Sequence, residues 1–164
     1  MADTVASLTT DGDDWSAAGA NRDSAGDTYS GLATANAPGG TPPTTSPAAS
    51  DDATKADASA KDGENAADQY ERAANDFDKA ADSYDKAAKL ENNQAAKDAL
   101  LEKAHGAREK AKAAREKAKK AYKDAAAERD RAAGDYKVAG DGQKEAANQS
   151  QAANDREKAV QIKP

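Results

Sequence analysis

The sequence predicts an all-α protein, built as an elongated alanine-rich coiled coil or as a helical hairpin or bundle, with an extended, low-complexity N-terminal arm. The first observation is a seven-residue repeat, because residues 66–72, 73–79 and 80–86 read AADQYER, AANDFDK and AADSYDK. The second is the return of alanine at every seventh position from Ala104 to Ala139. A sustained heptad of apolar positions is typical of helices that pack along a seam.

The composition argues against one ordinary globular core. The hydrophobic content of the 164 residues is 37%, and most of it is alanine, which buries little surface. A fully buried large side chain contributes roughly 1.5–3 kcal/mol. The few leucines, valines and aromatics therefore cannot offset the ordering entropy of the whole chain. We expect part of the chain to be disordered, or to become ordered only against a partner.

Residues 1–35 are predicted to form an acidic docking arm. Their apolar residues recur at helical spacing, but glycines at positions 19, 26 and 31 each cost about 1 kcal/mol in a helix interior. The prediction is a marginal helix or an extended arm that becomes ordered when it docks. Its many aspartates indicate a docking surface that is not acidic. The partner-binding candidates are Trp15, Tyr29 and Leu32, whose large side chains supply contact area.

Residues 36–60 are predicted to be a linker rich in proline, threonine, serine and alanine. Four of the five prolines of the chain and the pair Gly39–Gly40 lie in this segment. Such a composition favours an extended, partly polyproline-like conformation.

Residues 61–139 are predicted to be the heptad-repeat helical region, with a first helix at about 62–91. One core position of its repeat is aromatic and the other is alanine, so that large rings can lie over small residues of a neighbouring helix. The aromatic seam candidates are Tyr70, Phe77 and Tyr84.

The repeat slips by three positions at residues 91–94, and two interpretations compete. A slip of three can be a stammer within one continuous coiled coil, or Asn92 and Asn93 can make a turn into an antiparallel hairpin. Residues 61–93 carry a net charge of -4 and residues 94–139 carry +5. Opposite charges on the two blocks favour the hairpin.

A second helix is predicted at about 95–138, with the seam candidates Ala104, Ala111 and Ala118. Glycines at positions 140 and 142 then indicate a stop. Residues 140–164 are predicted to be a weak C-terminal helix or tail, in which Ala146, Ala153 and Val160 keep the sevenfold spacing.

No catalytic, cofactor-binding or metal-binding residue is predicted, and the chain is not expected to be an enzyme. His105 has only Glu102 and Glu109 at helical spacing, which is too few ligands for a metal site. Paired aspartates on a polar helix lack the partly buried pocket that acid–base chemistry needs. The basic run from Arg108 to Lys123 is diluted by glutamates, which argues against nucleic-acid binding.

We expect the chain to be made in the cytoplasm, since it shows no signal peptide and no apolar run long enough to cross a membrane. The expected function is a structural or assembly protein, a homo-oligomer within a larger assembly. Small alanine- and aspartate-rich coiled coils with anchored arms are typical of virion accessories such as decoration, collar or fibre proteins, so a virion is the expected location.

Two alternatives for the function stay open. The alanine-, lysine- and acid-rich helices resemble the stress-protecting late embryogenesis abundant class, although that class favours eleven-residue repeats. The similar segments SYDKAAK (83–89) and AYKDAAA (121–127) resemble paired-helix adaptor modules of the tetratricopeptide type, although their spacing differs from the repeat length of that family.

Overall fold

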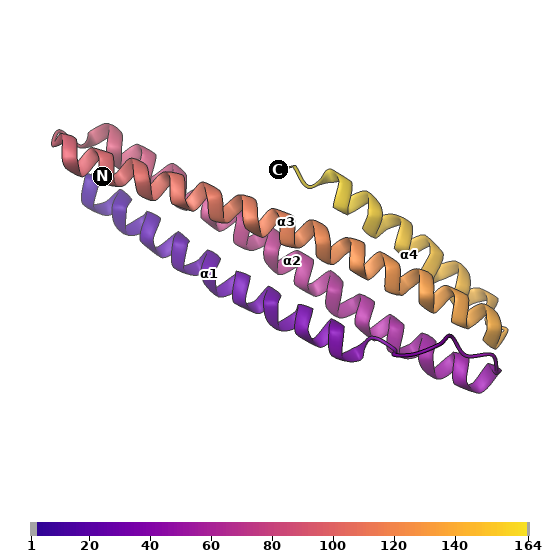
Figure 1. The fold of residues 1–164 in the computed structure, drawn as a ribbon. Helices are drawn as coiled ribbons and strands as arrows, with labels where there is room; N and C mark the ends of the chain where they lie inside the picture. The colour runs from indigo at the N-terminus through magenta and orange to yellow at the C-terminus, as the bar shows by residue number, and fades with distance from the viewer. Residues whose placement is uncertain (1–2, 164) are drawn as a thin grey trace. The chain divides into compact units, whose positions relative to one another are not determined.

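The computed structural model describes residues 3–163, and this part of the chain contains four helices and no strand (Figure 1). The helices are α1 (Val5–Asn36), α2 (Ser46–Leu90), α3 (Gln94–Ala139) and α4 (Gly142–Gln161). The predicted all-α class is therefore confirmed. Residues 1, 2 and 164, which fall in the predicted arm and tail, lie outside the described residues.

The chain forms two compact units. Unit 1 consists of residues 3–24 and 69–116, and unit 2 consists of residues 25–68 and 117–163. Helices α1, α2 and α3 each contribute one segment to each unit, whereas α4 belongs to unit 2 alone.

Antiparallel pairing of α2 and α3 organises unit 1. Arg108 forms an ion pair with Asp85, and Arg115 forms one with Asp78. A step of seven residues forward along α3 is thus matched by a step of seven residues back along α2. This is the pairing expected when an acidic and a basic helix share a heptad spacing and run in opposite directions.

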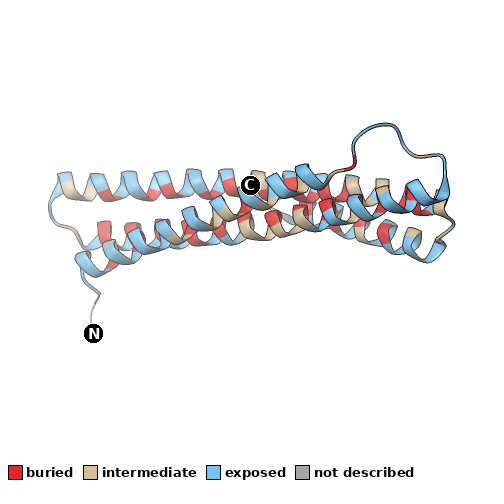
Figure 2. Cartoon of the chain, turned by 90° about the horizontal axis from the view of Figure 1, so that it is seen from below, coloured by how far each residue is buried: buried red, intermediate tan, exposed pale blue. Residues whose placement is uncertain are grey.

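The interior of unit 1 is filled by alanine methyl groups around a few large side chains. One cluster gathers Leu8, Tyr84 and Leu100 with alanines of α2 and α3, and a second packs Phe77 between two alanines of each of these helices. Figure 2 shows that buried residues recur along each helix instead of forming one continuous block. The small residues allow the helix backbones to approach closely, so that each ring can fill the remaining space.

A short turn at residues 91–93 connects α2 to α3. The side chain of Asn93 accepts a hydrogen bond from the backbone N–H of Ala96 at 3.1 Å, and the carboxylate of Glu91 accepts one from the N–H of Asn93 at 2.8 Å. Asn93 therefore caps the start of α3. Of the two interpretations of the slip in the repeat, the structure contains the chain reversal and not the stammer.

Unit 2 repeats the antiparallel pairing and adds α4. Ala53 and Ala56 of α2 form a buried cluster with Ala132 and Tyr136 of α3. The hydroxyl of Ser59 donates a hydrogen bond of 2.7 Å to the carbonyl of Ala33 in α1. These contacts tie the unit 2 segments of the first three helices together.

The turn between α3 and α4 depends on a glycine. Gly140 adopts a φ of +83°, and the backbone N–H of Asp141 donates a hydrogen bond of 2.9 Å to the carbonyl of Tyr136. This is a Schellman-type helix end, which favours glycine because a left-handed φ strains other residues. The side chain of Asp141 then caps α4 by accepting from the N–H of Lys144 at 3.1 Å.

The predicted linker at 36–60 is wrong over most of its length, because α2 begins at Ser46. The residues between α1 and α2 are 37–45 alone. Pro47 lies in the first turn of α2, where a missing N–H breaks no helical hydrogen bond. Ala49, Ala53 and Ala56 are fully buried at a spacing of four and three, so packing extends the helix through a segment whose composition resembles a linker.

The extended alternative for the N-terminal arm is also corrected, since residues 5–36 form a helix. A Cβ added to Gly12 would lie 2.6 Å from the Tyr84 ring, and one added to Gly19 would lie 2.8 Å from the Phe77 ring. Glycine at these positions lets the aromatic rings of α2 touch the backbone of α1. Two of the glycines of α1, one of them counted as helix-weakening in the sequence, are therefore part of its packing surface.

The heptad predicted for the C-terminal segment does not match the buried face of α4. The helix itself is present, but Val160 is 79% exposed, and Ala146 and Ala153 are exposed as well. The buried residues of this helix are Asn148, Ala152, Asp155 and Ala159. Their spacing of four, three and four places two polar side chains among the buried ones.

Candidate functional site

All six residues predicted to form the seam are buried. In unit 1, Phe77 and Ala111 share one core cluster, and Tyr84 and Ala104 share another. Tyr70 of unit 1 and Ala118 of unit 2 are also buried. These side chains pack inside a single chain, and a seam between chains stays a prediction.

The hydroxyl of Tyr84 links the core of unit 1 to an acidic side chain of α1. It donates a hydrogen bond of 2.7 Å to Asp13, and Lys103 of α3 contacts the same carboxylate oxygen at 2.9 Å. The hydrogen bond from Tyr84, followed by that from Lys103, holds the pKa of Asp13 below its usual range. One carboxylate thus connects α1 to both other helices of the unit.

The three residues predicted to bind a partner have different surroundings. Trp15 of unit 1 is 37% exposed, and the ammonium group of Lys79 lies 4.0 Å from its ring centroid. In unit 2, Leu32 is 45% exposed and Tyr29 is half-buried. Trp15 and Leu32 therefore keep apolar surface available, whereas Tyr29 is partly covered.

Two aspartates of α1 have cationic partners within the chain. Asp13 pairs with Lys103 in unit 1, and Asp27 pairs with Lys117 at 3.1 Å in unit 2. The sequence predicts that these aspartates face a surface that is not acidic, and the basic helix α3 provides such a surface for Asp13 and Asp27. Asp13 and Asp27 were predicted to face a separate partner, but their ion pairs are with lysines of α3 in the same chain.

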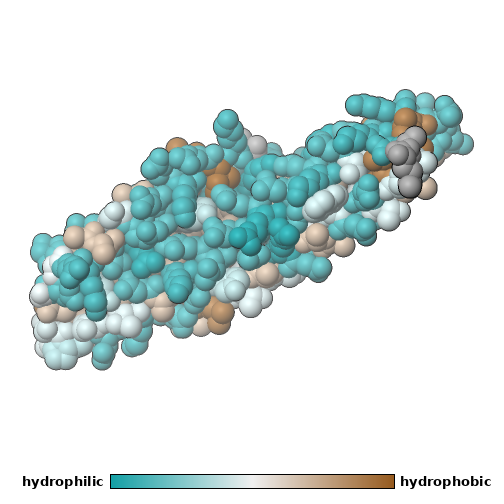
Figure 3. Space-filling model, turned by 180° about the vertical axis from the view of Figure 1, so that it is seen from behind, coloured by the Kyte–Doolittle hydropathy of each residue, from teal (hydrophilic) through white to brown (hydrophobic). Residues whose placement is uncertain are grey.

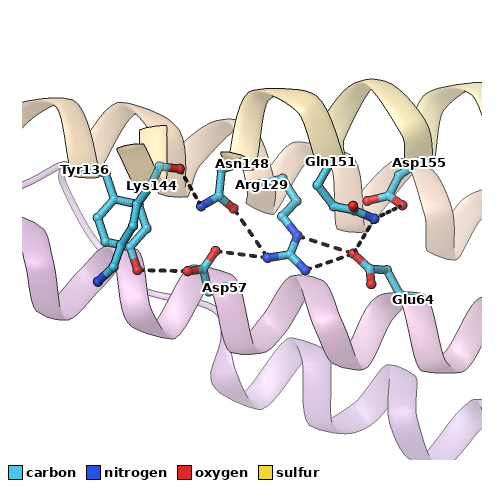
Figure 4. Close-up of polar contacts among 8 residues, drawn as sticks. All are labelled: Asp57, Glu64, Arg129, Tyr136, Lys144, Asn148, Gln151 and Asp155. Atoms are coloured by element: carbon cyan, nitrogen blue, oxygen red, sulfur yellow. Dashed lines mark hydrogen bonds and ion pairs between the residues drawn. The ribbon is translucent and has the colours of Figure 1, made fainter. Parts of the chain in front are cut away.

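A polar network centred on Arg129 joins α2, α3 and α4 in unit 2 (Figure 4). The guanidinium group donates to Asp57 at 3.1 Å, to Glu64 at 3.0 Å and to the side-chain oxygen of Asn148 at 3.4 Å. The Tyr136 hydroxyl donates to the second oxygen of Asp57 at 2.8 Å. Burial, and then the hydrogen bond to Asp57, raise the pKa of Tyr136. One arginine therefore satisfies acceptors on two other helices.

Asp155 of α4 is the most deeply buried acidic group of this network, with a side chain fully inaccessible to solvent. The amide of Gln151 donates to Asp155 at 3.3 Å and to Glu64 at 3.5 Å, and so lies between the two carboxyl groups (Figure 4). The second oxygen of Asp155 has no hydrogen-bond partner. Burial, followed by the charge of Glu64, raises the pKa of Asp155 to about 6.

No residue of this network is predicted from the sequence to belong to a site. The available signal was helical spacing, since Asn148, Ala152, Asp155 and Ala159 lie on one face of α4. A stripe that mixes alanine with two polar residues predicts a buried helix face whose polar groups need partners on a neighbouring helix.

Unit 2 also contains a cavity of about 290 Å³. The residues that line it include Ala33, Ser59, Ala66 and Glu128. Burial raises the pKa of the Glu128 carboxyl, one oxygen of which has no hydrogen-bond partner. The volume is at the lower limit for sites that hold a small molecule.

The surface is mostly polar, and the large apolar side chains that reach it are scattered. On the face drawn in Figure 3 they form separate small spots and no continuous patch. In residues 3–163, no helix has the length and apolar character needed to cross a membrane. The same residues contain no group of three or more histidine or acidic side chains placed to hold a metal ion.

Comparisons with models of known protein families, with curated proteins and with solved structures gave no match for this chain. The functional proposal therefore depends on the packing, charges and exposed side chains described above.

Proposed function

We propose that this chain is a non-enzymatic structural protein, an oligomeric coiled-coil component of a larger assembly. The observation that carries the proposal is the way the helices pair: alanine layers and aromatic rings alternate between them, and ion pairs of opposite charge hold their register. Such an interior stabilises long helices in a fixed relation, which is what a scaffold requires.

We further propose that the N-terminal helix anchors the chain to its partner. Trp15 and Leu32 of α1 are 37% and 45% exposed, although other residues of this helix pack inside. Exposed tryptophan and leucine side chains offer contact area to a second protein. In this proposal the anchor consists of exposed residues of the folded helix α1, and not of an extended arm. A virion accessory, such as a decoration, collar or fibre protein, is the assembly component that we favour.

Sedimentation velocity over a concentration series tests the proposal. We expect the full chain to form a dimer or trimer. With a second copy of the chain as the partner of α1, Trp15→Ser and Leu32→Ser should weaken self-association at least tenfold, about 1.4 kcal/mol. Val160→Ser is the matched control, because Val160 is 79% exposed but lies on α4. A chain that stays monomeric at all concentrations would contradict the homo-oligomer.

Stress protection remains the second candidate, favoured by the small number of large side chains in the buried clusters. Circular dichroism of the dilute chain distinguishes the two functions. A structural protein is expected to be helical in dilute buffer, whereas a stress-protecting helix former is expected to gain its helices only on drying.

A further inference from the structure

The polar network beneath α4 contains more acidic than basic groups. Arg129 of α3 faces Asp57 and Glu64 of α2, and Asp155 approaches the same network from α4. Lys158, also on α4, is the other cation acting on Asp155, but its ammonium group lies 5.0 Å from the ring centroid of Tyr122. Apart from Lys158, one guanidinium group therefore faces three carboxyl groups, and it can balance the charge of only one of them.

The hydrogen bonds of the three carboxyl groups show that one oxygen of Asp155 has no donor. Arg129 and Tyr136 satisfy the two oxygens of Asp57, and Arg129 and Gln151 donate to one oxygen of Glu64. Asp155 receives a hydrogen bond from Gln151 on one oxygen, and its other oxygen is buried with no partner. A proton on that oxygen would remove an uncompensated buried charge and supply a donor beside Glu64.

Helix α4 buries little apolar surface, so the protonation state of Asp155 has a large effect on the stability of its packing. The buried residues of the helix are two alanines, Asn148 and Asp155. Two buried methyl groups contribute little compared with the cost of an unpaired buried carboxylate. The protonation state of Asp155 is therefore able to decide how firmly α4 packs on α2 and α3.

We propose that α4 is a proton-controlled helix, which packs firmly on α2 and α3 when Asp155 is protonated and loosens when Asp155 ionises. The sign follows from the pKa of Asp155, which is about 6 in the folded chain against the ordinary value of 3.8 for an aspartate carboxyl. The packed state binds the proton more tightly than the released state, so packing is strongest below the lower value. It weakens as the pH rises through about 6. Release uncovers the rings of Tyr122 and Tyr136, over which Lys158 and Lys144 lie.

Amide hydrogen exchange of the full chain at pH 5 and pH 7.5, corrected for the intrinsic pH dependence, tests the proposal. Linkage between the two pKa values predicts that the open fraction of α4 rises about tenfold over this range. Amides of unit 1 serve as the internal reference and should show no such change. Asp155→Asn, which resembles the protonated carboxyl, should keep α4 equally protected at both pH values.

Asp130→Asn is the matched control, because Asp130 is an exposed carboxylate that also contacts α4, through Arg156. This variant should retain the pH dependence of the unsubstituted chain. If Asp155→Asn does not fold, the ¹³C titration of the Asp155 carboxyl in the unsubstituted chain still tests the proposal. A midpoint near 6 supports the proposal, and a midpoint below 5 overturns it. Equal pH dependence of α4 exchange in the unsubstituted chain and in Asp155→Asn also overturns it.

Discussion

At the scale of single residues, glycine has two opposite effects in α1. In an exposed helix interior it is unfavourable because it leaves the backbone flexible in the unfolded chain. At Gly12 and Gly19 the missing side chain instead leaves room for the rings of Tyr84 and Phe77. The same residue type thus weakens α1 at one position and lets it pack at another.

Replacing two glycines of α1 by alanine should therefore give opposite results. A Cβ on Gly19 would lie 2.8 Å from the Phe77 ring, whereas one on Gly31 would have no neighbour within 4 Å. We expect Gly19→Ala to lower the free energy of unfolding by about 1–3 kcal/mol, since a tightly packed ring must move. Gly31→Ala should raise it by about 0.5–1 kcal/mol through helix propensity. Urea unfolding measures both. Stabilisation of equal size in both variants would contradict the contact with Phe77.

At the scale of elements, charge pairs define which helix lies beside which. In unit 1 the seven-residue step from Arg108 to Arg115 along α3 is matched by the step from Asp85 back to Asp78 along α2. In unit 2 Arg129 reaches from α3 to both α2 and α4. Exposed pairs of this kind contribute only about 0–1 kcal/mol. Partly buried ones matter more, because the loss of one partner leaves the other charge uncompensated.

Arg129→Ala should therefore destabilise the chain far more than Lys120→Ala. Arg129 has a side chain only 16% exposed and two carboxylate partners, whereas Lys120 is 77% exposed and pairs with the exposed Asp124. Loss of one partner from a fully buried pair costs about 3–5 kcal/mol, and partial exposure lowers our expectation to about 2–3 kcal/mol. For Lys120→Ala we expect about 0.5 kcal/mol or less. Thermal unfolding followed by circular dichroism makes the comparison, and similar melting temperatures would show that the network contributes little.

At the scale of the whole molecule, α1 is part of both compact units. In unit 1 it covers the rings of Tyr84 and Phe77, and in unit 2 its Ala33 accepts a hydrogen bond from Ser59. An acidic tail that only keeps a protein in solution would make neither contact. The N-terminal segment therefore belongs to the folded structure.

Deletion of residues 1–35 should accordingly destabilise the remaining helices. The uncovered surface includes two aromatic rings of α2, and each large side chain contributes roughly 1.5–3 kcal/mol when buried. We expect the free energy of unfolding to fall by about 3 kcal/mol or more, together with increased binding of a hydrophobic dye. A chain shortened by residues 162–164, which follow α4, is the control and should unfold like the full chain. If the chain without residues 1–35 is as stable as the full chain, α1 does not stabilise the other helices and is a separate arm.

The sequence by itself determined the helical class and the buried heptad positions from Ala66 to Ala118, and it favoured a chain reversal near Asn93 over a stammer without deciding between them. These features depend on periodic apolar residues and on opposite net charges, which the order of residues contains directly. Only the tertiary structure decided that residues 5–36 and 46–60 are helical and that Asp155 is buried. By local propensity, glycine and proline disfavour a helix, and aspartate is expected at the surface. The ring that fills the space beside Gly19, and the neighbours that surround Asp155, come from distant parts of the chain.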